Sequence, residues 1–374
     1  MKKKIVIIEN NVISTNTMRK KFTACLIEEG YGVTILTTGT KEDLLTAKNN
    51  GFSVIDVKSS GLNPLHVLLY NLKLFQILSK IKPDVCLTFT VRPAIWGNLI
   101  TRILRIHTIT NITGIGPLFS SKNIAYKIAR TLYKFVLKNT HTIFFQNNDD
   151  KELFIKNNFV HHQNIGLIPG SGIDYHYYTP IEVKKENDTL KFLFIGRLLK
   201  DKGIIEFIEA AKILIQEKIN AKYLVVGTLW NQNLKHNTIT QKDLDQWIDD
   251  GIIDYLGPTT DVRPIIASVD CVVLPSYREG TSNVLLEASS MEKPCITCNT
   301  TGCREIVEDQ LTGLLCNVAD SKDLAEKMKQ MISFSEEKRA EMGKNARKKV
   351  VKEFDKQIVL DAYLKAIKDC LKNK

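Results

Sequence analysis

The chain has 374 residues, of which 44% are apolar and 25% charged, and this length predicts two domains, each with its own core. Eight cysteines in a chain of this size argue against a disulfide framework, and no apolar run reaches the roughly 18 residues that a membrane span needs. The apolar run that follows Lys2, Lys3 and Lys4 is too short for a signal peptide, so we expect a cytoplasmic protein.

The net charge of +11 lies almost entirely in the first half of the chain. Residues 1–182 carry 22 Lys and Arg against 12 Asp and Glu, and between residues 58 and 138 twelve basic residues meet one acid, Asp84. A basic half indicates an anionic partner, which could be a nucleic acid, a membrane surface or a charged substrate.

Strands alternate with helical patterns along this first half. Strands are expected at residues 4–8, 33–36, 54–57, 85–89, 108–110 and 142–145, with one helix running from the first strand to about Glu29. This alternation predicts an α/β domain with a parallel sheet covered on both faces. The loop after the first strand lacks G-x-G-x-x-G, which argues against a dinucleotide-dependent dehydrogenase.

A basic helix is predicted over residues 123–138. Its basic stripe consists of Lys127, Arg130, Lys134 and Lys138, and its apolar stripe of Ile124, Ile128, Leu132 and Phe135. Residues 64–82 form a second helical segment that is apolar almost all round. Such a helix can lie on an anionic membrane; the alternative is ordinary packing with a solvated basic face. Arg92, after strand 85–89, could meet a phosphate group of a ligand.

The pattern restarts in the second half, which gives predicted domains of residues 1–180 and 181–374 with a polar linker at 184–188. Strands are expected at 191–195, 223–226, 252–256, 271–274 and 295–297, and three helices begin near residues 322, 336 and 355. Two Rossmann-like domains facing a cleft are therefore predicted. Cys295 and Cys298 fall on opposite faces of a strand, which argues against a metal site.

The most informative stretch runs from Glu279 to Glu287. Glu279 lies on a loop after the buried strand 271–274, just ahead of a helix whose start offers the cap residues Thr281, Ser282 and Asn283. Ligands bind at this end of strands in open α/β sheets, and a helix N-terminus favours phosphate. Glu287 falls about two turns further on and can reach a second polar part of the same ligand, so a nucleotide-sugar is indicated.

A second element follows strand 191–195. Gly196 can let a ligand approach the backbone, and Arg197 and Lys202 can converge on one anionic group beyond the strand. A guanidinium and an ammonium together suit a diphosphate. The alternative is a solvated basic loop, but cations at a helix start oppose the helix dipole.

These two elements resemble the E-x7-E and G-R-x-x-x-x-K-G motifs of GT-B glycosyltransferases of family 4, which retain anomeric configuration. The resemblance implies that the last helix returns to the first domain. The resemblance implies that Arg197 and Lys202 bind the donor diphosphate, Glu279 the sugar hydroxyls and Glu287 the ribose. It also implies that backbone N–H groups of Gly280, Thr281, Ser282 and Asn283 contact sugar and phosphate, and that Leu256 and Gly257 seat the base. No metal is expected, because the D-x-D at Asp243 and Asp245 falls on a helix, where the two carboxylates diverge.

The first half departs from the family at the group that contacts the reacting sugar, for which Asn111 and Thr113 are our suggestions. Residues 60–64 and 112–117 resemble segments of PglA-like, capsule and O-antigen enzymes that extend undecaprenyl-diphosphate-linked sugars. We therefore expect transfer of a hexose or N-acetylhexosamine, from UDP, to a polyprenyl-diphosphate-linked sugar on the inner face of the membrane. The alternatives are a UDP-sugar 2-epimerase of the same fold and a nucleic-acid-binding protein; the latter is disfavoured because no stacking aromatics accompany the basic residues.

Overall fold

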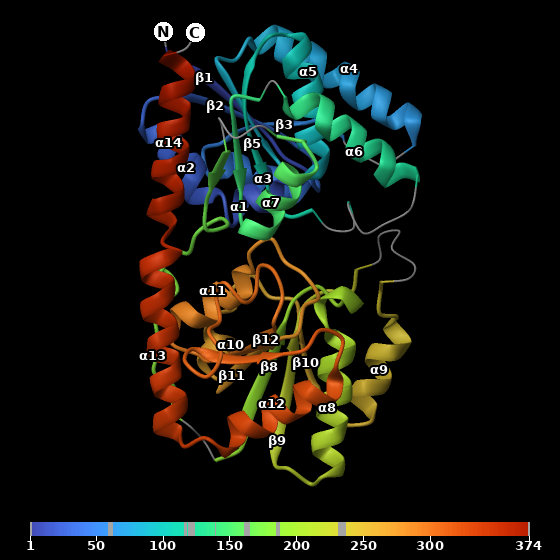
Figure 1. The fold of residues 1–374 in the computed structure, drawn as a ribbon, viewed down its shortest axis with the longest axis vertical. Coiled ribbons are helices and arrows are strands. Elements are labelled where there is room, and N and C mark those ends of the chain that lie inside the picture. The colour runs from blue at the N-terminus through green and yellow to red at the C-terminus, as the bar shows by residue number, and fades with distance from the viewer. Residues whose placement is uncertain are drawn as a thin grey trace. The chain divides into compact units, whose positions relative to one another are not determined.

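The chain forms two compact units in the computed structural model (Figure 1), one of residues 1–171 with 357–374 and the other of residues 172–356. The structure describes residues 2–58, 63–115, 118, 124–138, 140–160, 165–184, 188–230 and 237–372. The predicted boundary after residue 180 falls nine residues beyond the division at 171. Part of the predicted linker, residues 185–187, lies outside the described residues.

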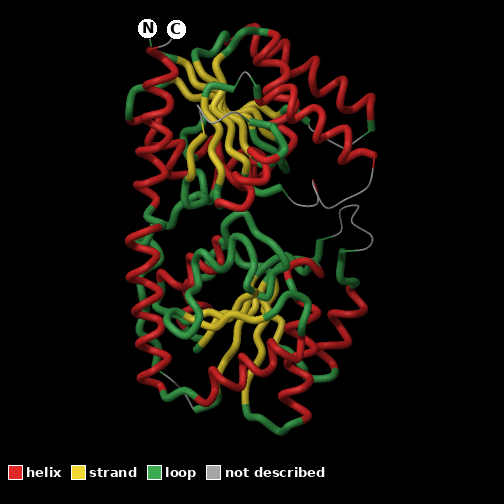
Figure 2. The backbone as a smooth tube through the Cα atoms, in the orientation of Figure 1, coloured by secondary structure: helices red, strands yellow, loops and turns green. Residues whose placement is uncertain are grey.

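The first unit is built on a parallel sheet with strand order β3-β2-β1-β4-β5-β6-β7. Its strands are β1 (Lys4–Ile8), β2 (Gly32–Thr37), β3 (Ser53–Asp56), β4 (Val85–Phe89), β5 (His107–Ile112), β6 (Thr142–Phe145) and β7 (Ile165–Leu167). Every residue of β4 is buried, as expected of a central strand that is covered on both faces. Figure 2 shows these strands gathered in one layer with helices outside them.

The helices of this unit are α1 (Val12–Asn16), α2 (Lys20–Glu28), α3 (Lys41–Asn49), α4 (Pro64–Ile81), the π-helix η1 (Pro93–Gly97), α5 (Asn98–Ile103), α6 (Ile124–Leu137), α7 (Asn148–Lys156) and α14 (Lys356–Lys372). The single helix predicted up to Glu29 is wrong, because the chain breaks between α1 and α2. At this break Arg19 turns inward, donates to the buried Glu9 carboxylate at 2.9 Å and stacks on Phe89.

The second unit has a six-stranded parallel sheet of order β10-β9-β8-β11-β12-β13. Its strands are β8 (Leu190–Ile195), β9 (Ala221–Val226), β10 (Asp254–Gly257), β11 (Cys271–Leu274), β12 (Cys295–Cys298) and β13 (Gly313–Cys316). Its helices are α8 (Ile204–Gln216), α9 (Gln241–Asp249), α10 (Arg263–Ala267), α11 (Asn283–Ser290), α12 (Ser321–Ser333) and α13 (Glu336–Glu353), with the 3-10 turn η4 (Lys200–Lys202).

The last helix completes the core of the first unit, as the sequence predicted. Tyr363 of α14 is buried, and its ring lies 4.8 Å from that of Phe22 and 4.9 Å from that of Phe144. Figure 1 shows α14 running beside α2. The two ends of the second unit lie side by side, because the N–H of Ile173 donates to the carbonyl of Phe354 at 2.7 Å.

Two further properties concern membranes and metals. Among the described residues, no helix combines the length and hydropathy that crossing a bilayer requires. Within the same residues no group of His, Cys, Asp and Glu is arranged to hold a metal ion, and all eight cysteines are free thiols. Asp243 is used in the capping box of α9 with Thr240.

Candidate functional site

Three loops meet at the carboxyl ends of β8, β11 and β12. The Tyr277 N–H, after β11, donates to the Asp201 carbonyl, after β8, at 2.9 Å. The Glu279 N–H donates to the Thr301 carbonyl, after β12, at 3.0 Å. These backbone bonds hold the loop of Glu279 between its two neighbours, so the side chains of the two sequence motifs come from one rigid rim of the sheet.

Lys202 and Glu279, taken from separate motifs, form an ion pair. The Lys202 Nζ lies 2.5 Å from Glu279 Oε1, and the two side chains are only 19% and 14% exposed. A part-buried, charge-assisted contact of this kind is well shielded from water. The rim therefore carries a cation and a carboxylate side by side, where one ligand bearing both phosphate and hydroxyl groups can meet each of them.

Gly302 and Gly227 are needed for the backbone path of this rim. Gly302 has φ +80° and a Cβ there would overlap the Glu279 carbonyl, while a Cβ on Gly227, which has φ +153°, would overlap the Gly196 carbonyl. A side chain at either position would push apart the loops that hold Glu279 and Arg197. Sequence reasoning missed both glycines, because their neighbours are distant in the chain.

Arg197 is exposed and its guanidinium carbon lies 4.8 Å from the centre of the Trp230 ring. The backbone beneath it is fixed, since the Gly196 N–H donates to Val226 and the Leu198 N–H to Thr228, both at 3.0 Å. Trp230 is a second residue that the sequence motifs did not identify. Its ring holds the guanidinium by a cation–π contact while leaving the N–H donors of Arg197 for an anion.

The start of α11 differs in one respect from the prediction. Ser282 is the N-cap of this helix, as expected. However, its backbone N–H donates to the Gly302 carbonyl at 3.0 Å, so this N–H is already used within the protein. Gly280, Thr281 and Asn283 lie in the same loop and first turn of α11.

Glu287 lies on α11 and accepts a hydrogen bond from the Tyr178 hydroxyl at 3.1 Å. Burial raises the pKa of its carboxyl to about 7, against the opposing effects of Tyr178 and Lys356. At the end of β10, Leu256 is 47% exposed and Gly257 has φ +72°. The neighbouring Tyr255 hydroxyl donates to the Gly227 carbonyl at 2.7 Å, which ties β10 to the loop after β9.

In the first unit, Arg92 follows β4 and stacks on Tyr70 of α4, with 4.6 Å from its guanidinium carbon to the ring centre. Its Nε and one terminal nitrogen are buried without a hydrogen-bond partner among the described residues. Burial lowers the pKa of this guanidinium, and Tyr70 opposes the effect. Buried guanidinium nitrogens without a partner are costly, so an anion is the natural partner for this half-buried side chain.

Asn111 and Thr113 are placed differently from each other. Asn111 is buried in β5 and its amide donates to the Tyr363 hydroxyl at 2.7 Å, so that end of the side chain faces α14. Thr113 is half-buried in the loop after β5. The segments compared with lipid-linked-sugar enzymes, residues 60–64 and 112–117, fall partly outside the described residues.

The face of α6 that the protein buries is not the predicted apolar stripe. Tyr133, Val136 and Leu137 are buried, whereas Ile128 and Phe135 are 56% and 50% exposed. The exposed face also carries three members of the predicted basic stripe, Lys127, Lys134 and Lys138. The fourth, Arg130, is half-buried and donates to the Leu118 carbonyl at 2.7 Å.

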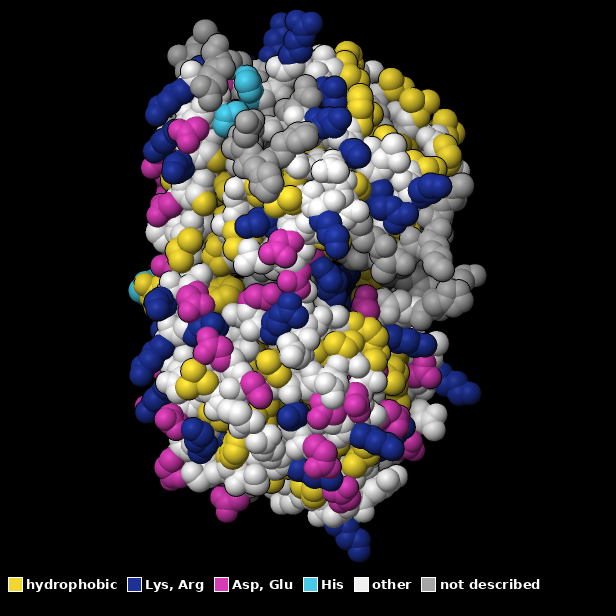
Figure 3. Space-filling model, in the orientation of Figure 1, with side chains coloured by type: hydrophobic (Ala, Val, Ile, Leu, Met, Phe, Trp, Pro, Cys, Tyr) yellow, Lys and Arg dark blue, Asp and Glu magenta, His cyan; other side chains and the backbone are white. Residues whose placement is uncertain are grey.

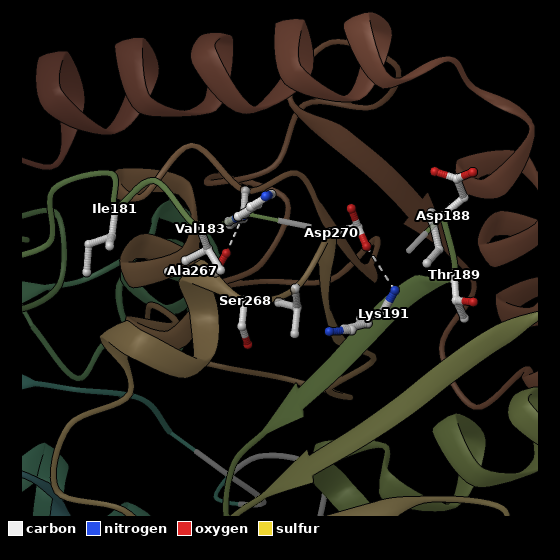
Figure 4. Close-up of a pocket in the computed structure, with 12 residues that line it drawn as sticks. Ile181, Val183, Asp188, Thr189, Lys191, Ala267, Ser268 and Asp270 are labelled. Carbon is white, nitrogen blue, oxygen red and sulfur yellow. Dashed lines mark hydrogen bonds between the residues drawn. The ribbon is translucent and has the colours of Figure 1, made fainter. Parts of the chain in front are cut away.

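A pocket at the opposite edge of the second sheet is separate from this rim (Figure 4). It has a volume of about 220 Å³ and lies at the amino ends of β8 and β11, lined among others by Ile181, Lys191 and Ser268. Two of its charged side chains are engaged within the protein: the Asp270 carboxylate accepts from the backbone N–H of Lys191 at 2.9 Å, and Lys293 Nζ donates to the Ala267 carbonyl at 2.8 Å. We do not assign the donor to it, since none of the motif residues lines it.

Comparisons with known proteins agree with this architecture. The fold is similar to that of a glycosyltransferase from Rickettsia africae, with a TM-score of 0.80 at 18% identity over all of both chains. It is also similar to Anabaena HepE solved in complex with UDP-glucose, with a TM-score of 0.79 at 18% identity over 99% of this chain and 100% of that one. The fold is therefore that of the GT-B class.

More particularly, the chain belongs to the family 4 glycosyltransferases, because a glycosyltransferase family model matches each of its two halves. These models are "Glycosyl transferase 4-like" over residues 7–147 and "Glycosyl transferases group 1" over residues 180–349. A Campylobacter jejuni relative is an N,N'-diacetylbacillosaminyl-diphospho-undecaprenol alpha-1,3-N-acetylgalactosaminyltransferase, 26% identical over 86% of each chain. An Escherichia coli relative is a UDP-Gal:alpha-D-GlcNAc-diphosphoundecaprenol alpha-1,3-galactosyltransferase, 28% identical over 76% of this chain and 75% of its own. These matches do not support the epimerase or the nucleic-acid-binding protein.

Proposed function

We propose that this enzyme transfers a hexose or N-acetylhexosamine from a UDP-sugar to a sugar carried on undecaprenyl diphosphate, with retention of configuration. The observation that carries the proposal is the 2.5 Å contact between Lys202 and Glu279. It brings together, at the carboxyl edge of the second sheet, one group suited to a diphosphate and one suited to sugar hydroxyls. The UDP-glucose complex of HepE and the names of the relatives support the choice of ligands.

In this proposal Arg197 and Lys202 bind the diphosphate and Glu279 accepts hydrogen bonds from the sugar. Glu287 takes the ribose hydroxyls, and Leu256 with Gly257 contacts the base. The leaving diphosphate gains negative charge as the glycosidic bond breaks. Two fixed cations therefore stabilise the transition state more than the ground state, and this difference is what accelerates the reaction.

Retention is assigned to attack on the same face as the leaving group. Glu279 is held by Lys202 and by its loop, and we assign the role of a nucleophile to no carboxylate. The acceptor hydroxyl would then pass its proton to the departing diphosphate oxygen, while the new bond forms at the anomeric carbon. No metal is needed in this scheme, because Arg197 and Lys202 carry the charge that a cation would otherwise neutralise.

The acceptor and its surroundings are assigned to the first unit. Arg92 has buried guanidinium nitrogens without a partner among the described residues, which suits an acceptor phosphate. The exposed lysines of α6, Lys127, Lys134 and Lys138, suit the headgroups of an anionic membrane. We place the enzyme at the inner face of the cell membrane for this reason.

The test is a transfer assay with purified enzyme. UDP-linked hexoses and N-acetylhexosamines are offered one at a time with synthetic polyprenyl-diphosphate-linked sugars, and the product's anomeric configuration is read by NMR. We expect one UDP-sugar to be used, with an axial donor giving an axial product. Hydrolysis or transfer with inverted configuration, or turnover only with a non-nucleotide donor, would contradict the proposal.

A further inference from the structure

We infer that the outward face of α4 inserts into the headgroup and upper acyl region of an anionic lipid bilayer, with the exposed face of α6 lying on the headgroups. This goes beyond the lysine contacts of the proposed function, because it adds an apolar anchor. It rests on the proposed function only for the reason why a membrane is needed, namely a lipid-linked acceptor. The occupant to which we commit is the bilayer.

The outward face of α4 is apolar to a degree that is unusual for a solvated helix. Leu65, Leu68, Leu69, Leu72 and Phe75 are each between 40% and 60% exposed. Their spacing of three and four residues places them in one stripe of the helix. The opposite stripe, with Tyr70, Leu74 and Leu78, is buried against the first unit. The exposed stripe therefore has no partner of its own among the described residues, and such a patch marks an interaction surface.

The charges around this stripe select the kind of partner. The helices α4, η1, α5 and α6 contain no Asp or Glu, while Lys73, Lys80, Arg102, Lys127, Arg130 and Lys134 are basic. The exposed face of α6 mixes Lys127 and Lys134 with the exposed Ile128 and Phe135. Figure 3 shows hydrophobic side chains gathered over the α4 side of the first unit with Lys and Arg beside them. Apolar side chains on helices that carry basic and no acidic residues fit anionic lipid better than a soluble protein of mixed charge.

The dimensions favour a helix lying in the membrane surface. With 18 residues and a rise of 1.5 Å each, α4 is about 27 Å long. Its buried stripe packs on the protein along its length, so it cannot leave the first unit to span a bilayer. Lying flat, it places its leucines a few Å below the headgroups, as amphipathic interfacial helices do.

This placement also explains the position of Arg92. Its guanidinium stacks on Tyr70, which belongs to the buried stripe of α4. A helix embedded at the lipid boundary therefore carries, on its inner side, a cation at the level where a lipid-linked diphosphate leaves the membrane. The same element would hold the enzyme on the bilayer and bring the acceptor to Arg92.

The test compares an apolar variant, a charge variant and a control. Leu68→Gln with Leu72→Gln removes part of the apolar stripe, and Lys127→Glu, Lys134→Glu and Lys138→Glu reverses the exposed charge on α6. The control is Ile215→Gln with Leu311→Gln, since these side chains are 43% and 48% exposed in the second unit. Co-sedimentation is measured with phosphatidylcholine vesicles containing or lacking phosphatidylglycerol, at low and high salt, after confirming that each variant melts as the wild type does.

We expect the apolar variant to partition about 10- to 100-fold less onto anionic vesicles at both salt concentrations, because two leucines lose their apolar environment. The charge variant should lose the part of binding that salt also removes, and the control should bind as the wild type does. Wild-type binding by the apolar variant would overturn the inference. So would sedimentation velocity showing that the wild type self-associates through this face and the apolar variant does not, with vesicle binding unchanged.

The two proposals fail separately. If the wild type does not transfer sugar from any UDP-sugar to a short soluble acceptor, the proposed function fails whatever the vesicles show. If transfer to the short acceptor is intact in the apolar variant and transfer to a long-chain acceptor in vesicles is also intact, the membrane role of α4 fails while the proposed function stands.

Discussion

Replacing Glu279 with Gln should strengthen the binding of UDP and at the same time slow sugar transfer. In the free enzyme, Lys202 is held 2.5 Å from the Glu279 carboxylate, with both side chains less than one-fifth exposed. When UDP binds, its phosphates must share Lys202 with that carboxylate, and the negative charge of the carboxylate repels them. Glu279→Gln keeps the shape and removes the charge, so it should strengthen UDP binding while abolishing most transfer.

The magnitude follows from the charges involved. Two unit charges about 6 Å apart interact by roughly 3 kcal/mol at an effective dielectric constant near 20. Rearrangement and solvent screening reduce this, so we expect a net gain of about 1 kcal/mol, or roughly fivefold in the Kd of UDP. Loss of the sugar contact should lower turnover on the order of 100-fold or more, as for other polar contacts made in a transition state.

Isothermal titration calorimetry with UDP and a radiolabelled transfer assay measure the two effects. A double-mutant cycle provides the control: in a Lys202→Ala background, Glu279→Gln should no longer strengthen UDP binding, because the cation for which the two anions compete is gone. A folded Glu279→Gln enzyme that transfers sugar at near the wild-type rate would refute the role of this carboxylate. Weaker UDP binding by this variant would refute the idea that the Glu279 carboxylate and UDP compete for Lys202.

Three further outcomes are expected. Arg197→Ala and Lys202→Ala should each weaken UDP binding and slow transfer, and unchanged calorimetric affinity in both would remove the diphosphate assignment. EDTA should leave activity intact, so loss with EDTA that manganese restores would show a metal requirement. Because the folded pKa of Glu287, about 7, lies above its usual 4.5, its ionisation costs the folded state stability as pH rises from about 4.5 to 7. Glu287→Gln should therefore raise the free energy of unfolding more at pH 8 than at pH 5, by at most about 3 kcal/mol, which is measured as a larger rise in melting temperature at pH 8. The variant should also remove any decline in UDP affinity that the wild type shows between pH 8 and pH 6.

Much of the fold could be predicted because its signals are local. Buried runs such as Val85–Phe89 and Cys271–Leu274 are apolar throughout and alternate with helices, which specifies parallel sheets. The strands β7 and β13 were missed because each is short and contains a glycine, a residue that is depleted in strands. The first helix was drawn too long because nothing local to Arg19 shows that it will reach back to Glu9.

The site residues, too, could be predicted from the sequence only where their signals are local. Motif spacing identified Glu279 and Lys202, but their contact joins loops 77 positions apart, and only the folded sheet edge brings them together. Trp230 and Gly302 act on residues distant in the chain and have no motif of their own. On α6 the sequence places Ile128 and Phe135 in one apolar stripe, but periodicity shows which residues share a stripe and not which stripe the protein buries.

The return of α14 to the first unit has a consequence for how the protein is made. Tyr363 sits among the rings of Phe22, Phe89 and Phe144, and Val359, Leu360 and Ile367 belong to the same core. The first unit consists of residues 1–171 and 357–374, so the ribosome synthesises the whole second unit between its two segments. The first unit therefore cannot bury this apolar groove during synthesis, and its completion must wait for the last helix to emerge. A nascent chain arrested after residue 171 should present the groove to chaperones, and expression of residues 1–171 alone should yield aggregated protein that a co-expressed α14 peptide partly rescues.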